Sequence, residues 1–98
     1  MTEQPITLKQ LREEYDVTPA QLRFLKALHQ SAFNYAFYST SGKAVVLHAP
    51  THEEVAVSTP RTLEHLWYNG YVVDQFQGQF VTTDLGQALV QAFGRLVS

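Results

Sequence analysis

Residues 58–83, STPRTLEHLWYNGYVVDQFQGQFVTT, decide the fold expected for this chain of 98 residues. The stretch opens with the signals of a short helix: Thr59 as the N-cap, Pro60 at the first helical position and Gly70 where a left-handed residue ends a helix. Apolar residues at helical spacing follow these signals and predict one buried stripe. The stripe consists of Leu63, Leu66 and Trp67.

The second half of the stretch predicts a β-hairpin. Residues 71–76 and 79–83 are rich in aromatic and β-branched residues, and the pair Gln77-Gly78 between them is a two-residue turn signal. Thr83 or Asp84 can then cap a last helix. Its apolar stripe either covers the core or pairs with a second copy in a dimer, and the sequence does not separate these uses. The stripe consists of Leu85, Leu89, Ala92, Phe93 and Leu96.

Two further helices are predicted upstream. Thr7 and Gln10 have the spacing of a capping box and begin a short helix that runs to Tyr15. Thr18 and Gln21 have the same spacing, with Pro19 at the first helical position and the apolar pair Val17 and Leu22 around them. Leu25 and Leu28 continue the buried face of this second helix.

The segment between the second helix and Ser58 is ambiguous. Phe33, Ala36 and Phe37 extend the helical period to about Tyr38, which favours a long helix, whereas Phe33, Tyr35 and Phe37 also alternate as in a strand. Residues 44–48 form a short Val-rich run that predicts a strand pairing with the hairpin in a three-stranded sheet. Thr51 and Glu54 have capping-box spacing and predict a single helical turn over residues 52–57.

This order of signals resembles the winged-helix branch of the helix-turn-helix superfamily, in the bacterial transcriptional-regulator type. The stretch VSTPRTLEHLWYNGYVV is similar to a third helix leading into the first wing strand, and FVTTDLGQALVQAF is similar to the second wing strand and the following helix. The resemblance covers roughly residues 18–96. It implies one α+β winged-helix domain over residues 1–98, with a helical core, a small three-stranded antiparallel sheet and a C-terminal helix.

The resemblance also implies a function. The solvent face of the helix from Pro60 to Asn69 would enter the major groove of double-stranded DNA, as in a small transcriptional regulator that forms a homodimer through its C-terminal helix. Arg61, Thr62, His65 and Asn69 would contact the groove, Tyr68 and Lys43 the backbone, and Gln77 and Gln79 would make weak wing contacts. A second reading places a helix-turn-helix over residues 11–25, in which Arg23, Gln21 and Ala27 would face DNA.

Composition weighs against a strong DNA binder. The formal net charge is -2, and the wing tip from Gln75 to Gln79 carries neither Lys nor Arg. The alternative is a winged helix that binds a protein partner and has little or no DNA affinity. The aromatic residues at positions 33, 35, 37 and 38 could stack on single-stranded bases, but packing in a core or a dimer interface is the simpler reading.

Other classes of function find little support. The chain has no cysteine, no Gly-rich phosphate loop and no nucleophile elbow, so we expect no enzyme. His48 and His52 with Glu53 or Glu54 are possible zinc ligands, but Pro50 prevents their presentation on one continuous helix, and we expect no metal or cofactor. The N-terminal MTEQPITLKQ lacks a signal-peptide pattern and no apolar run is long enough to span a membrane, so a cytoplasmic protein is expected.

Overall fold

The computed structural model describes residues 6–97, so the first five residues of the N-terminal segment assessed for a signal peptide lie outside it. Four α-helices and five strands follow one another along the described chain. The helices are α1 (Leu8–Tyr15), α2 (Pro19–His29), α3 (Pro60–Tyr68) and α4 (Asp84–Phe93), and a 3-10 turn, η1 (Gly94–Leu96), follows α4. The strands are β1 (Asn34–Tyr38), β2 (Ala44–His48), β3 (Glu53–Ser58), β4 (Val72–Phe76) and β5 (Gln79–Thr82).

The helix starts predicted at Thr7, Thr18 and Thr83 are confirmed with their caps, and α3 begins after Thr59 as predicted, although the Thr59 side chain makes no capping hydrogen bond. The Thr7 hydroxyl accepts from the Gln10 amide, and Thr18 and Gln21 form the full capping box that begins α2. The Thr83 hydroxyl accepts from the Gly86 amide at the start of α4. Each side-chain oxygen satisfies an amide that has no partner within its own helix, which explains why these short helices begin where the sequence indicates.

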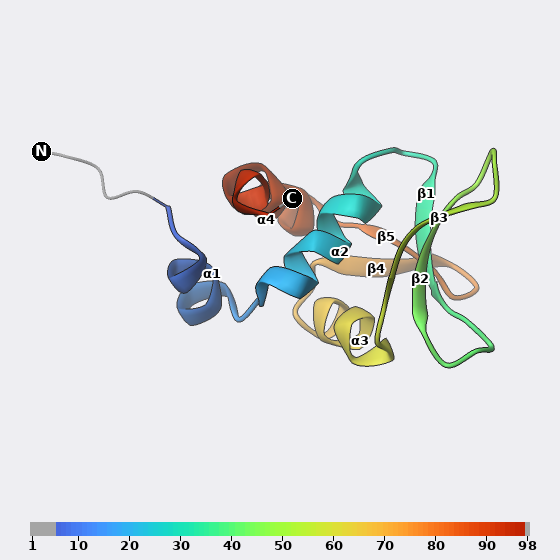
Figure 1. Ribbon diagram of the computed structural model, residues 1–98, viewed down its shortest axis with the longest axis horizontal. Helices are drawn as coiled ribbons and strands as arrows, with labels where there is room; N and C mark the ends of the chain where they lie inside the picture. Colours follow the sequence, from blue (N-terminus) through green and yellow to red (C-terminus); the bar gives the residue numbers. More distant parts are fainter. Residues whose placement is uncertain (1–5, 98) are drawn as a thin grey trace, which may run out of the picture.

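The five strands form one antiparallel sheet in the order β3-β2-β1-β5-β4. The α+β class is confirmed, but the predicted three-stranded sheet is wrong. Figure 1 shows the helices gathered on one side of the sheet, with α2 in the middle and β1, β2 and β3 at the far side. The core lies between them and includes Leu22, Leu25 and Leu28 of α2, with Ala36 of β1 and Val46 of β2.

The helical prediction for residues 33–38 is wrong, because α2 ends at His29 and β1 follows. Asn34 fixes this change of direction. Its buried amide donates to the carbonyl oxygen of Ala27 at 2.9 Å, and its Oδ1 lies 2.7 Å from Nδ1 of His48. Ala36 is fully buried on the side of β1 that faces α2. The alternation of residues 33, 35 and 37, and not their helical spacing, therefore describes the segment.

The helical turn predicted for residues 52–57 is also wrong, because these residues lie mostly in β3, which pairs with β2. The Thr51 hydroxyl accepts from the amide of Glu53, two residues on, and so closes a turn in place of a helix. His52 adopts a left-handed conformation with φ of 60° and reverses the chain. The sheet thereby gains a β2–β3 hairpin that the sequence interpretation did not include.

The hairpin from β4 to β5 is confirmed at its predicted turn. Gln77 and Gly78 have φ values of 45° and 86°, and the amide of Gly78 donates to Oδ1 of Asp74 at 3.0 Å. Two predictions of burial are wrong in part. Trp67 is 46% exposed at the margin of α3, and Leu85 is 54% exposed on α4, because these helices turn the centres of their stripes and not the flanks toward the core.

Candidate functional site

Helix α3 carries most of the residues predicted to contact DNA, and the structure separates them into two groups. Arg61 and Tyr68 are exposed, and Tyr68 has 89% of its side chain accessible. Lys43, in the turn from β1 to β2, is also exposed, as are Gln77 and Gln79 of the hairpin. These five residues are accessible to a partner of any class.

The second group is occupied within the protein. Thr62 is buried, and its hydroxyl accepts from the Ser58 hydroxyl at 2.8 Å. Because β3 runs directly into α3 through Ser58 and Thr59, this side of the helix is covered by the chain that precedes it. The prediction that Thr62 lies on the exposed face is therefore wrong.

His65 and Asn69 lie at the junction between α3 and the turn that joins α1 to α2. Nε2 of His65 is 2.6 Å from the carbonyl oxygen of Asp16, so Nε2 must carry the proton that is donated. The side-chain amide of Asn69 lies 3.0 Å from the same nitrogen. A carboxylate oxygen of Asp16 lies 3.5 Å from it. His65 therefore ties α3 to the turn between α1 and α2, whereas the Asn69 side chain reaches only His65, and both side chains are only half-exposed.

Positive charge around α3 is sparse. Arg61 and Lys43 are accompanied by Glu64, which is exposed on α3 and whose charge adds to the effect of burial in raising the pKa of Tyr38. Lys26 on α2 serves the fold, because its Nζ donates to the carbonyl oxygens of Gly94 and Val97, at 2.8 Å each. In the alternative helix-turn-helix over residues 11–25, Arg23 is exposed but the side chain of Gln21 closes the capping box.

A second surface, of which the sequence interpretation considered only the aromatic residues, lies on the side of β1, β2 and β3 that faces away from the helices (Figure 1). We call it the outer face and define it by two cross-strand rows of side chains. The first row is Phe37, Val45 and Val57, and the second row is Tyr35, Leu47 and Glu54. All five apolar members stand apart from the core cluster and from the residues packed against it, so the helices do not cover them.

The outer face is apolar and partly accessible. The rings of Tyr35 and Phe37 lie side by side with centroids 5.8 Å apart, and Val57 is 47% exposed. Phe33, which is 64% exposed, precedes β1 and continues its alternation. Val45 is buried although it lies on the outer face, because the flanking residues Phe37 and Val57 cover it. Three adjacent strands thus present aromatic and aliphatic side chains to solvent.

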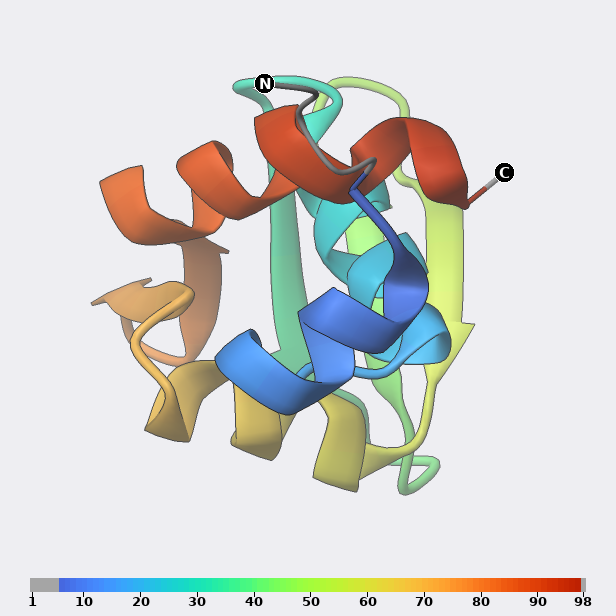
Figure 2. The ribbon, with the colours of Figure 1, turned by 90° about the vertical axis from the view of Figure 1, so that its left-hand side faces the viewer.

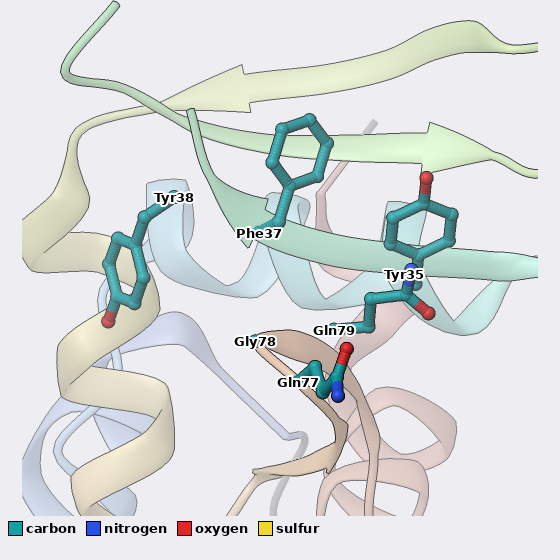
Figure 3. Close-up of a pocket in the computed structure, with 6 residues that line it drawn as sticks. All are labelled: Tyr35, Phe37, Tyr38, Gln77, Gly78 and Gln79. Atoms are coloured by element: carbon teal, nitrogen blue, oxygen red, sulfur yellow. The ribbon is translucent and has the colours of Figure 1, made fainter. Parts of the chain in front are cut away.

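A groove of about 350 Å³ borders this face. Figure 3 shows Tyr35, Phe37 and Tyr38 on one side of it and the turn of the β4–β5 hairpin on the other. Gln77 and Gln79, predicted as wing contacts to DNA, line this groove with Gly78. The hairpin turn therefore supplies amide groups beside an aromatic wall, which suits a partner with both apolar surface and polar backbone groups.

The residues considered for zinc do not form a site. Nδ1 of His48 is engaged by Asn34, and between residues 6 and 97 no group of three His, Asp or Glu side chains is positioned to hold a metal ion. Across the same residues, none of the helices has the length and apolar composition that a membrane span requires.

A scan against protein-family models found no match, and searches of curated proteins and of solved structures found no similar chain. The geometry described above is therefore the basis for assigning a function. The sequence did contain a signal for the outer face: the alternation of aromatic residues at positions 33, 35 and 37. Whether this alternation marks an exposed sheet face depends on the pairing of β1 with β2 and of β2 with β3, and no local sequence pattern specifies that pairing.

Proposed function

We infer that the protein is a non-catalytic module that binds a protein partner through the outer face. The observation that carries this inference is the apolar surface made by Tyr35, Phe37, Leu47 and Val57 on the face of the sheet that no helix covers. Contiguous exposed apolar surface on a small domain is characteristic of an interaction site. Aromatic residues are the side chains most enriched at the centre of protein interfaces.

The charges around the outer face favour a protein over a nucleic acid. Glu53 and Glu54 are exposed at one end of the face, and Lys43 lies at the other. Aromatic platforms for single-stranded nucleic acid work together with a positively charged groove that follows the phosphates. Here the carboxylates would repel phosphate, and the groove beside Tyr35 and Phe37 is lined by uncharged Gln77 and Gln79.

Binding of double-stranded DNA is the second candidate, and one observation favours it. Helix α3 leads directly into the β4–β5 hairpin, which is the order of recognition helix and wing in winged-helix regulators, and Arg61, Tyr68 and Lys43 are exposed beside it. The support is weaker, because Thr62 is buried, His65 is engaged with Asp16 in the α1–α2 turn, and the Asn69 side chain lies against His65.

Peptide display tests the protein-binding proposal. Random peptides are selected on the wild-type protein and then assayed on Val57→Glu, which places a charge at the outer face, and on Leu85→Glu, which makes the same change at an exposed site on α4. The proposal predicts enriched apolar peptides that bind wild type and Leu85→Glu and lose binding to Val57→Glu. Peptides that bind all three proteins equally would refute it.

Fluorescence anisotropy with a random duplex at about 50 mM salt tests the DNA candidate, because counterion release favours binding most at low salt. Under the protein-binding proposal the duplex stays free at micromolar protein. Tight duplex binding that Arg61→Ala and Lys43→Ala each weaken would replace the protein-binding proposal with the DNA candidate.

A further inference from the structure

The two ends of the outer face carry opposite charges. Lys43 directly precedes β2, at a position that strand alternation assigns to the same side as Val45 and Leu47. Glu54 pairs with Leu47 at the other end. Leu47 follows Lys43 by four positions of extended chain, which corresponds to about 13 Å. The row of Phe37, Val45 and Val57 lies midway between these charges.

We propose that the partner of the outer face is a second copy of this chain, packed face to face in a symmetric dimer. This inference rests on the proposed function, since it uses the same surface. Two sheets packed on each other are related by a twofold axis that lies between them, either along the strands or across them. The two choices give opposite electrostatic results.

An axis along the strands above β2 places Lys43 of one copy opposite Lys43 of the other. It carries Glu54 of β3 to the position above Tyr35 of β1, so the lysines repel each other and no opposite charges meet. An axis across the strands reverses the strand direction of the second copy. Lys43 of each copy then lies over Leu47 of the other, beside the Glu54 that pairs with that Leu47, and two Lys43–Glu54 ion pairs close the ends of the interface. The charge pattern therefore selects the axis across the strands.

In this arrangement the axis passes over the row of Phe37, Val45 and Val57. Apolar side chains of one copy meet those of the other, across the spacing of about 10 Å at which sheets stack. Lys43 has to reach across this spacing, which its four-carbon stem allows while the methylenes cover Leu47 of the other copy. The groove beside Tyr35 takes the margin of the second copy, where the amides of Gln77 and Gln79 meet it.

The area predicts a weak dimer. Three strands of five or six residues form a surface of about 15 Å by about 17 Å, which is smaller than the roughly 800 Å² that each partner buries in a standard interface. We therefore expect dissociation in the micromolar range. The sequence predicted dimer contact through α4 instead. That helix has less apolar surface free for a second copy, because its Leu89 and Phe93 are buried in the core.

Sedimentation equilibrium over a wide range of protein concentration, with charge-swap variants, tests the proposal. Lys43→Glu and Glu54→Lys each create like charges at both ends and should weaken the dimer at least fivefold. The double variant restores both ion pairs in reverse and should return to within about threefold of wild type. Val57→Glu should abolish the dimer, and Leu85→Glu should leave it unchanged.

A matched control comes from α1. Lys9 and Glu13 are an exposed pair 4.0 Å apart on the helix far from the outer face (Figure 2). Lys9→Glu, Glu13→Lys and their double variant change the net charge by the same amounts and should leave the dimer constant unchanged. Circular dichroism of each variant establishes that it is folded.

Any of three results would overturn the proposal. The wild-type protein stays monomeric at millimolar concentration, the single substitutions at Lys43 and Glu54 leave the dimer constant unchanged, or the double variant does not regain the wild-type dimer constant. Failure of the dimer leaves the proposed function standing if displayed peptides still lose binding to Val57→Glu. If the peptides bind Val57→Glu as well as they bind wild type, the proposed function fails as well.

Discussion

Gly86 in the first turn of α4 is the residue whose substitution the structure predicts most sharply. A Cβ atom at this position would lie 2.2 Å from the carbonyl oxygen of Tyr71 and 2.9 Å from Cγ2 of Thr82. Ordinary contact begins at 3.4 Å, so α4 and the Tyr71 carbonyl must separate by about 1.2 Å. The same carbonyl accepts from the amide of Thr83 at 3.1 Å, and that hydrogen bond would be lost or distorted.

The magnitude for Gly86→Ala follows from three terms. Overpacking typically costs about 1–3 kcal/mol, and a weakened backbone hydrogen bond adds about 1 kcal/mol. The helix preference of Ala over Gly returns about 1 kcal/mol, so a net destabilisation of about 1–3 kcal/mol is expected. Urea unfolding measures this loss of free energy, provided that the slope of free energy against urea concentration is the same for both proteins. Gln87 is exposed on the same helix, and the unfolding free energy of Gln87→Ala should stay within about 0.5 kcal/mol of wild type. A Gly86→Ala protein as stable as wild type, or more stable, would refute the predicted clash.

Three other predictions concern stability. Lys26→Met removes both hydrogen bonds to the chain after α4 and should lower the free energy of unfolding in urea by about 2 kcal/mol. Lys9→Met, at an exposed site, should lower it by less than about 0.5 kcal/mol. Equal effects would contradict the structural role of Lys26. Burial raises the pKa of Tyr71 above its ordinary 10.0, so the stabilisation from its neutral phenol is complete below pH 10.0 and is lost as pH rises through the folded-state pKa. Wild type should therefore lose more stability than Tyr71→Phe between about pH 9 and about pH 11 in thermal unfolding, and parallel curves would contradict this. Gln77→Asn should raise the unfolding free energy by a few tenths of a kcal/mol, because Asn tolerates the left-handed conformation at this turn better than Gln, and a lower value would argue against that conformation.

Elements with their own local signals were predictable. The capping residues Thr7, Thr18 and Thr83 define where three helices begin, and Gln77-Gly78 defines the turn of the β4–β5 hairpin. Each signal works within a few residues, because it pairs an unsatisfied amide with a nearby oxygen or allows a positive φ. Such signals do not depend on how the rest of the chain is packed.

Elements whose conformation depends on distant pairing were not predictable. Residues 34–38 fit a helix or a strand by periodicity, and their pairing with residues 44–48 and with Phe80 decides for a strand. The spacing of Thr51 and Glu54 is shared by capping boxes and by turns, and here the hydroxyl closes a turn. The burial of Thr62 has the same origin, since it follows from β3 entering α3 at Ser58.

The β2–β3 hairpin connects the error in the fold prediction to the proposed function. The expected pattern has a short helix before α3, and such a helix would offer its outward side as a polar, solvated surface. β3 in its place pairs with the predicted strand β2, so that two strands lie beyond β1 and display alternate residues on a side that α2 does not reach. Val45, Leu47 and Val57 are apolar at these positions, although an antiparallel sheet with one solvated face normally carries polar residues there. A hairpin that places apolar residues on both faces, Val46 and Ala56 toward the helices and Val45, Leu47 and Val57 away from them, is suited to a sheet covered on both sides. This pattern supports the proposal that a partner provides the second cover.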